Sequence, residues 1–216
     1  MFIGHNAVGF ASKRLAPRTS LGWLMTAPIL LDLLWPIFLL LGIEHVRIVP
    51  GDTNFTPFDF YDYPWSHSLL MAIVWGVLFA IAYYAKTRYA AGAITLAFGV
   101  VSHWILDFVT HRPDMPLYPG GPKVGLGLWN YPAATMIVEV AMFIAGVTIY
   151  VRATRPRDRT GILALWSFVL VLAFLYAGAA QGKAPPSVNA VIAAGFAQFL
   201  MPLWSMWIDR HREARG

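Results

Sequence analysis

Six long apolar runs dominate this chain of 216 residues and decide its fold class. A helix needs about 20 apolar residues to cross the hydrocarbon core of a bilayer, and each run is long enough. Only 12% of the residues are charged, which is about half the fraction found in a typical soluble domain. We therefore expect a single all-α, polytopic membrane domain over residues 1–216, with transmembrane helices at about 21–43, 64–85, 89–110, 132–151, 161–181 and 187–208.

The distribution of basic residues predicts the orientation of these helices. If both termini are cytoplasmic, twelve of the 16 Lys and Arg residues fall in cytoplasmic segments, which leaves four in outer loops, namely Arg47, Arg112, Lys123 and Lys183. This excess is the positive-inside pattern. We expect a multi-pass protein of the bacterial inner (cell) membrane, in contact with membrane lipids and with both termini in the cytoplasm. The pattern accounts for the net charge of +5, so no nucleic-acid partner is expected, and it does not indicate an oligomeric state.

The third predicted span ends in three ionisable residues spaced by four, His103, Asp107 and His111. Residues four apart lie above one another on one helix face. Pro113 disfavours helical geometry at Arg112, which predicts that the helix ends near His111. Ionisable residues at membrane depth are costly and usually functional. The H-x-x-x-D pair is therefore a candidate to bind one cation from a single helix.

Other polar residues are expected at the same depth. Basic residues hold the far end of the short apolar segment 1–14 in the cytoplasm, which predicts a re-entrant half-helix that begins inside the membrane. His5 then lies about 12–15 Å above that end, level with Asp32 of the first span. The residues expected in this layer are His5, Asp32, His67, His103, Asp107 and Glu139, with His111 at the helix end. Imidazoles and carboxylates together suit zinc, manganese or iron, so we expect one or two divalent ions, with zinc the first choice.

Less specific interpretations stay open for several of these residues. His67 and the pair in the third span could form a proton relay or interhelical hydrogen bonds, because intramembrane charges need partners. Glu139 could orient a ligand histidine from behind instead of binding the metal. His45 and His211 are expected to lie outside the site, in a loop and in the tail, and Asp59 is expected to be a solvated loop residue.

These residues also carry a family resemblance. The chain resembles the bacterial family of predicted membrane-bound metal-dependent hydrolases, small inner-membrane proteins with an N-terminal His, an Asp in the next segment, an H-S pair and a later H-x-x-x-D. The matching positions cover roughly residues 1–145 and are His5, Asp32, His67-Ser68, His103 and Asp107. Their order is also similar to that of the zinc-dependent phospholipase C and nuclease group, an all-helical fold with a trinuclear zinc cluster.

The second likeness implies how the residues would share metal ions. The five matching positions would hold two metals, with Asp107 bridging them, and His111 and Glu139 would be the candidates for a third. The sequence departs from these patterns at two places. Leu34 stands where the family often has a second Asp, and no second histidine occurs near Glu139.

We expect the function of a metal-dependent hydrolase, of the phosphoesterase class, acting on a lipid or amphiphilic phosphoester at the outer face of the membrane. Metal ions would activate water and clamp the reacting oxygens. The expected catalytic residues are Asp107, Glu139 and Arg112, and Arg112 together with Lys123 would hold the phosphate. The chain has no Cys and no G-x-S-x-G elbow, which argues against the common covalent routes. Two alternatives remain open: a metal-ion or proton transporter, and a structural protein whose metal ties helices together.

Overall fold

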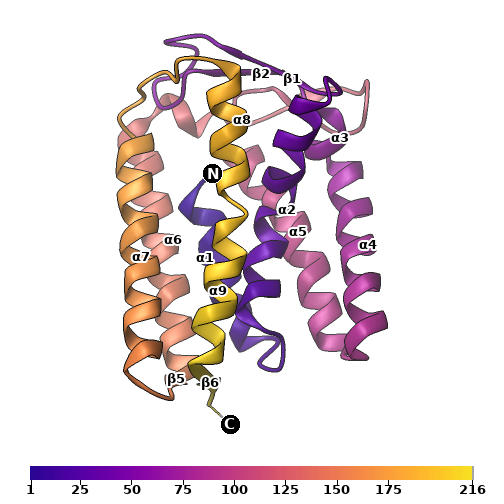
Figure 1. Ribbon diagram of the computed structural model, residues 1–216. Helices are drawn as coiled ribbons and strands as arrows, with labels where there is room; N and C mark the ends of the chain where they lie inside the picture. Colours follow the sequence, from indigo (N-terminus) through magenta and orange to yellow (C-terminus); the bar gives the residue numbers. More distant parts are fainter. Residues whose placement is uncertain (216) are drawn as a thin grey trace.

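The computed structural model describes residues 1–215 as a bundle of long helices (Figure 1). Within those residues, six segments are long and apolar enough to cross a membrane. They are α2 (Leu21–Leu40), α4 (Leu69–Thr87), α5 (Ala90–Thr110), α6 (Pro132–Ala153), α7 (Arg159–Ala179), and the pair α8 (Val188–Ala197) and α9 (Leu200–Arg210). The predicted all-α polytopic fold with six spans is confirmed.

Two of the predicted spans are interrupted. The second contains a short helix, α3 (Pro64–His67), which stops because Ser68 adopts an extended conformation. The Ser68 hydroxyl then accepts a hydrogen bond from the backbone N–H of Met71 and caps α4. The last span has a turn at Gln198 that separates α8 from α9. The first break matters for the site, because it leaves His67 at the very end of α3.

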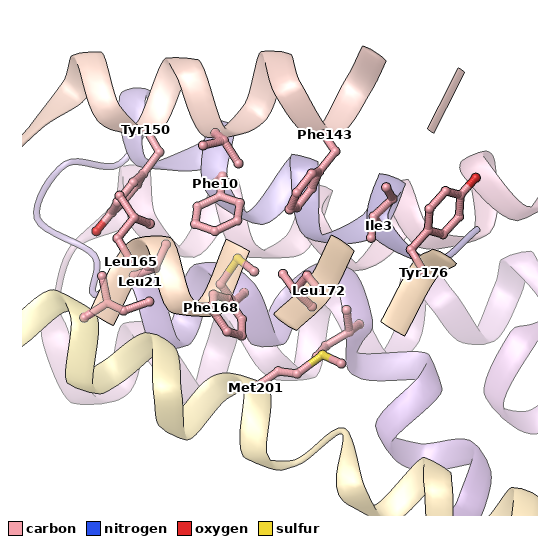
Figure 2. Close-up of a cluster of buried hydrophobic side chains, with 14 of the residues drawn as sticks. Ile3, Phe10, Leu21, Phe143, Tyr150, Leu165, Phe168, Leu172, Tyr176 and Met201 are labelled. Carbon is pink, nitrogen blue, oxygen red and sulfur yellow. The ribbon is translucent and has the colours of Figure 1, made fainter. Parts of the chain in front are cut away.

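The N-terminal segment forms the expected half-helix inside the bundle. Helix α1 (Ile3–Ala11) continues into a 3-10 turn, η1 (Ser12–Arg14), and packs against α2, α5 and α6. Figure 2 shows Ile3 and Phe10 of α1 among the buried side chains of α6 and α7, such as Phe143 and Phe168. A helix of this length spans about 14 Å, so α1 reaches only part of the way through the bundle.

One glycine allows α1 to lie this deep. A Cβ atom on Gly146 of α6 would lie 2.4 Å from the carbonyl oxygen of Ala7, a separation that no real side chain tolerates. The backbones of α1 and α6 can therefore approach closely only because residue 146 lacks a side chain. This contact brings the polar start of α1 to the height of the polar residues on α5 and α6.

Short strands and turns cover the two ends of the bundle. One end carries the antiparallel hairpin of β1 (His45–Ile48) and β2 (Phe58–Asp62), the pair β3 (Met115–Pro116) and β4 (Lys123–Val124), and the turn η2 (Leu128–Asn130). The other end carries β5 (Thr154–Pro156), which pairs with β6 (Arg212–Ala214). We call these the hairpin end and the C-terminal end. The sequence analysis did not predict these strands. The strands β1 to β4 cover the bundle at the hairpin end.

Candidate metal centre

The polar residues predicted at membrane depth meet in the hairpin half of the bundle. They include two groups of three residues. Within each group, every residue has one potential ligand atom, and these three atoms lie within 4.8 Å of one another. The groups share His103 of α5 and are His5–His103–Asp107 and Asp32–His67–His103. Five residues from α1, α2, α3 and α5 thus form one continuous cluster, as the depth argument predicted. Whether a metal ion binds there stays a prediction.

Asp107 connects one side of the cluster. Its Oδ1 lies 3.0 Å from Nε2 of His5, and its Oδ2 lies 3.0 Å from Nε2 of His103. The two imidazole rings stack, with centroids 3.9 Å apart. The amino group of Met1 also contacts Asp107 Oδ1 and lies 3.3 Å from the hydroxyl of Thr110. Asp107 therefore offers one oxygen to each of two histidines.

On the other side, a hydrogen-bond relay orients His67. Glu44 follows α2, and its Oε1 accepts hydrogen bonds from the backbone N–H groups of Trp65 and Ser66, both at 2.7 Å. Its Oε2 accepts the Ser66 hydroxyl at 2.6 Å, and Ser66 Oγ lies 2.6 Å from Nδ1 of His67. When Glu44 is ionised, Ser66 must donate to it, so Ser66 Oγ accepts the proton of His67 Nδ1. Nε2 of His67 then carries a lone pair.

His103 is held in the same tautomer by the backbone. Its Nδ1 lies 2.8 Å from the carbonyl oxygen of Pro28, which can only accept. Pro28 lies inside α2, and although it has no N–H to donate, its carbonyl can still accept. The Nε2 atom of His103 is therefore also left with a lone pair when the ring is neutral.

The two lone pairs face each other. Nε2 of His67 lies 3.2 Å from Nε2 of His103, and Asp32 Oδ1 lies 3.5 Å and 3.8 Å from these two nitrogens. Acceptors this close repel each other unless a cation or an extra proton lies between them. These two nitrogens and the Asp32 oxygen are thus a suitable set of ligands for a divalent cation, because imidazole nitrogen and carboxylate oxygen are common ligands of zinc.

His111 lies beside the cluster, just past the end of α5, close to where the sequence predicted the helix end. Its Nδ1 lies 2.9 Å from Asp114 Oδ1, and its ring packs on Trp129 with centroids 4.1 Å apart. Its Nε2 is 3.9 Å from Oδ2 of Asp107. Burial raises the pKa of Tyr63, whose hydroxyl stays protonated and donates to Asp114. His111 is therefore held firmly but does not belong to either group of close ligand atoms.

Glu139 has a different set of partners from the predicted one. Its Oε2 accepts hydrogen bonds from the backbone N–H groups of Phe2 and Gly4, at 2.8 and 3.1 Å. A carboxylate at this point satisfies the free donors at the start of α1 and interacts favourably with the helix dipole. Its Oε1 is buried and has no hydrogen-bond partner among the described residues. Glu139 thus caps α1 with one oxygen and keeps the other free, and it lies outside both groups of ligand atoms.

Arg112 and Lys123 do not lie where a phosphate contact requires them. The Arg112 guanidinium is bound by Asp52 and Asp59 of the hairpin and lies 3.4 Å from Asp114. Lys123 donates to the backbone carbonyl of Tyr61 at 2.6 Å. Neither residue lines the cavity above the cluster. We therefore correct the expected phosphate contact: Arg112 fastens the hairpin to the end of α5, and Asp59 is not merely solvated.

A cavity of about 540 Å³ lies directly above the cluster. Asp32, His67, Asp107, His111 and Glu139 line it on the polar side. The opposite sides consist of aromatic residues of the hairpin and of small apolar residues of α7 and α8. The cluster therefore faces a cavity whose other lining residues are mainly apolar.

Sequence reasoning missed the two residues that orient His67. Glu44 and Ser66 are each at most 1% exposed although they lie in or next to a loop. One usable signal was present, a carboxylate directly after the apolar run of the first span. Ser66 precedes His67 in the chain, but the resemblance drew attention only to Ser68, which caps α4 and does not contact the cluster.

One comparison with known proteins found a relative. Residues 64–184 match the family model of the YdjM inner membrane protein, which is more than half of the chain. No curated protein and no solved structure matches. The matched part runs from α3 past α7 and includes His67, His103 and Asp107 but not His5 or Asp32.

The family description names a membrane and no activity, so the expected hydrolase stays a prediction. The family match agrees with the six apolar spans and supports a multi-pass protein of the inner membrane. The side on which the termini lie is not determined by it. The chain belongs to the family of the YdjM inner membrane protein.

Proposed function

We propose that the chain is a membrane-embedded, metal-dependent hydrolase, and specifically a phosphoesterase that acts on a lipid or amphiphilic phosphoester at the outer face of the inner membrane. The observation that carries this proposal is the facing pair of Nε2 atoms on His67 and His103, 3.2 Å apart. With Asp32 and Asp107 beside them, they form a donor set for one or two divalent cations, zinc first and manganese or iron next.

The cluster has the features that phosphoester hydrolysis needs. A divalent cation held there would supply positive charge for the phosphate oxygens and make water a nucleophile at neutral pH. Asp107 suits a bridging role, because its two oxygens face His5 and His103 separately. Glu139 lines the same cavity, and its buried Oε1 has no hydrogen-bond partner among the described residues. We therefore assign to Glu139 the role of the base that accepts a proton from the attacking water.

We assign the second proton transfer to His111, in place of the predicted ligand role. Asp114 fixes its Nδ1 at 2.9 Å, so Nε2 is the nitrogen that faces Asp107 across 3.9 Å. Because its Nδ1 donates to Asp114, His111 would donate a proton from Nε2 to the leaving oxygen of a phosphoester in its doubly protonated form. The same assignment explains why a loop residue is packed so tightly between Trp129 and Phe60.

The filled core beneath the cluster favours hydrolysis over transport. Between the cluster and the C-terminal end, Phe10 of α1 packs on side chains that are at most 1% exposed, Tyr150 of α6 and Phe168 of α7 (Figure 2). A transporter needs a path that opens to both sides of the membrane. A cavity that ends on a packed core suits a reaction chamber.

The test is paired metal analysis and hydrolysis on the same purified preparations. Wild-type protein should carry about one or two equivalents of zinc, manganese or iron and hydrolyse members of a phosphoester and phospholipid panel. His103→Ala should lose both metal and hydrolysis. His45→Ala is the matched control, because His45 is exposed and paired with Asp62, and it should lose neither.

Two results would overturn the proposal. Full metal content in a folded His103→Ala protein would remove this cluster from metal binding. A metal-loaded wild type that hydrolyses nothing in the panel, while metal ions cross vesicles containing it, would replace the hydrolase with a transporter.

A further inference from the structure

The cavity above the metal centre is polar on one side and apolar on the others. Asp32, His67, Asp107 and Glu139 form the polar floor. Its volume of about 540 Å³ lies in the range of roughly 300–1,000 Å³ that holds a small organic ligand. A complete membrane lipid is larger than this, so a lipid bound here would have to extend beyond the cavity.

The hairpin covers the cavity on the aqueous side. Phe55, Phe58 and Phe60 line it from above. This roof is fastened at two points, because Arg112 binds two carboxylates of the hairpin and Asn54 donates to the backbone carbonyl of Asn130 at 2.9 Å. A ligand that approaches from water therefore meets a tethered aromatic cover.

The side of the cavity formed by α7 and α8 is not covered by the hairpin. On α8 the cavity is lined by Ala190, Ala194 and Ala197, which share one helix face because they are spaced by four and three. On α7 it is lined by Leu175 and Ala179. Leu175 is 45% exposed, and Ala179, Ala194 and Ala197 are also exposed. The same side chains thus line the cavity and form the outer surface of the bundle.

The break between α8 and α9 explains this opening. Helix α9 packs against α7 and α2, whereas α8 packs against α2 and β1. Gly195 lets α8 lie close to α2 at Pro36, because a Cβ there would lie 2.7 Å from the ring of Pro36. Above the turn at Gln198, α8 therefore follows α2, and Figure 1 shows it apart from the upper part of α7. This part of the surface belongs to the apolar span Val188–Arg210, so we expect it to face the hydrocarbon of a membrane.

A basic residue lies at the end of the opening near the membrane surface. Lys183 is in the segment between α7 and α8, lines the cavity and is exposed. A lysine near a helix end extends its amine toward the level of lipid head groups. The opening therefore has a cation at the head-group level, apolar residues below it and the metal centre behind it.

We propose that the substrate is a membrane lipid whose phosphate reaches the metal centre while its acyl chain lies in the gap between α7 and α8, the acyl gap. The lipid enters sideways from the leaflet at the hairpin end, and Lys183 contacts its anionic head group. The inference rests on the proposed function for the phosphate itself. The hairpin, the lining residues of α7 and α8, and Lys183 indicate the acyl chain and the anionic head group.

The experiment measures binding without hydrolysis. The protein is reconstituted in phosphatidylcholine vesicles with a trace of a long-chain alkyl phosphonate that carries a diazirine in its chain and has no ester to cleave. Illumination should label residues of α7 and α8 that line the acyl gap. An excess of unlabelled alkyl phosphonate should abolish this labelling, and methylphosphonate at the same concentration should not.

Matched variants locate the ligand. Ala194→Trp fills the acyl gap and should lower labelling by about tenfold or more, a change of roughly 1.4 kcal/mol in binding. Ala193→Trp is the control, because Ala193 is the neighbouring exposed residue and does not line the cavity. Lys183→Gln tests the head group without adding bulk to the gap, and it should weaken labelling while metal content stays constant.

The outcomes separate this inference from the proposed function. Equal labelling in Ala194→Trp and Ala193→Trp, or equal competition by methylphosphonate, would show that no acyl chain occupies the gap. Specific labelling in a protein that hydrolyses no phosphoester would uphold the acyl gap and remove the phosphoesterase. Hydrolysis without specific labelling would uphold the phosphoesterase and overturn the acyl gap.

Discussion

Replacement of Glu44 by glutamine tests whether the relay through Ser66 sets the proton on His67. The two side chains have nearly the same shape, but glutamine carries two donor hydrogens on Nε2. Its oxygen must stay where Oε1 accepts the backbone N–H groups of Trp65 and Ser66, so its amide nitrogen faces Ser66 Oγ and donates to it. Ser66 must then donate to His67 Nδ1, and the proton of His67 moves to Nε2, which faces Asp32.

The expected loss of zinc affinity follows from the one hydrogen bond that the variant must give up when the metal binds. To bind a cation through Nε2, the variant must leave one buried donor of the relay without an acceptor, which costs about 1–3 kcal/mol. Loss of the group behind a ligand histidine typically weakens metal binding by about 10–100-fold, which agrees with that range. We expect Glu44→Gln to bind zinc about 10–100-fold more weakly than wild type, while the metal-free proteins melt at similar temperatures.

The same relay makes the difference depend on pH. Burial raises the pKa of Glu44 to about 7; the hydrogen bonds from Ser66 and Trp65 oppose this rise, and the charge of Asp62 adds to it. Above that pH the carboxylate accepts from Ser66; below it, the protonated carboxyl donates instead, as glutamine does. Wild type therefore approaches the behaviour of the variant as pH falls. The ratio of the two zinc affinities should be largest near about pH 8.5 and approach one near about pH 5.5.

The assay is a zinc titration in competition with a chromogenic chelator, at both pH values and on detergent-purified protein. Asp62→Asn is the control for charge, because Asp62 is exposed and paired with His45, and it should keep the wild-type affinity at the higher pH. Ser66→Ala removes the relay but does not force the proton of His67 onto Nε2. Its loss of zinc affinity should therefore be smaller than that of Glu44→Gln. Wild-type affinity in a folded Glu44→Gln protein at the higher pH would refute the relay.

Three further predictions follow from the fold. Arg112→Ala should lower stability by about 1 kcal/mol in thermal melts, since its ion pairs are partly solvated, and should keep its metal; loss of metal with an unchanged melt would contradict this. Gly146→Ala should destabilise the bundle, because its Cβ meets the backbone of α1, whereas Gly178→Ala on α7 meets nothing within 4 Å and should not; equal melting temperatures would count against the close contact. Reporter fusions should give a cytoplasmic signal after Arg155 and an external signal at Pro119, and a reversed pattern would invert the assigned orientation.

The spans and the ligand layer could be predicted because they depend on local regularities. A helix rises by about 1.5 Å per residue, so sequence distance from a charged end gives depth, and this placed His5 and Asp32 at one level before any contact was known. The spacing of four in α5 put His103 and Asp107 on one face for the same reason. Neither argument requires knowledge of which helices are neighbours.

The orienting residues could not be predicted because they depend on pairings between distant segments. Arg112 seemed free to bind phosphate in a loop beside the site, but the hairpin brings Asp52 and Asp59 to it across more than 50 residues of chain. Glu44 reaches Ser66 only because the chain turns back between α2 and α3. A carboxylate in a loop has no periodicity that indicates its partner.

The position of α1 has a consequence for how the protein is made. Ribosomes add roughly 5–20 residues per second, so about 140 residues, or about 7–28 s, separate the synthesis of α1 from that of the end of α6. During this interval His5 and Asn6, both 1% exposed in the finished bundle, have neither α6 nor the N-cap from Glu139. Helix α1 therefore leaves the ribosome well before α6 but reaches its final place only after α6 has been made. Since α1 carries His5, the complete ligand cluster forms only in a chain whose insertion has already succeeded through the fourth span.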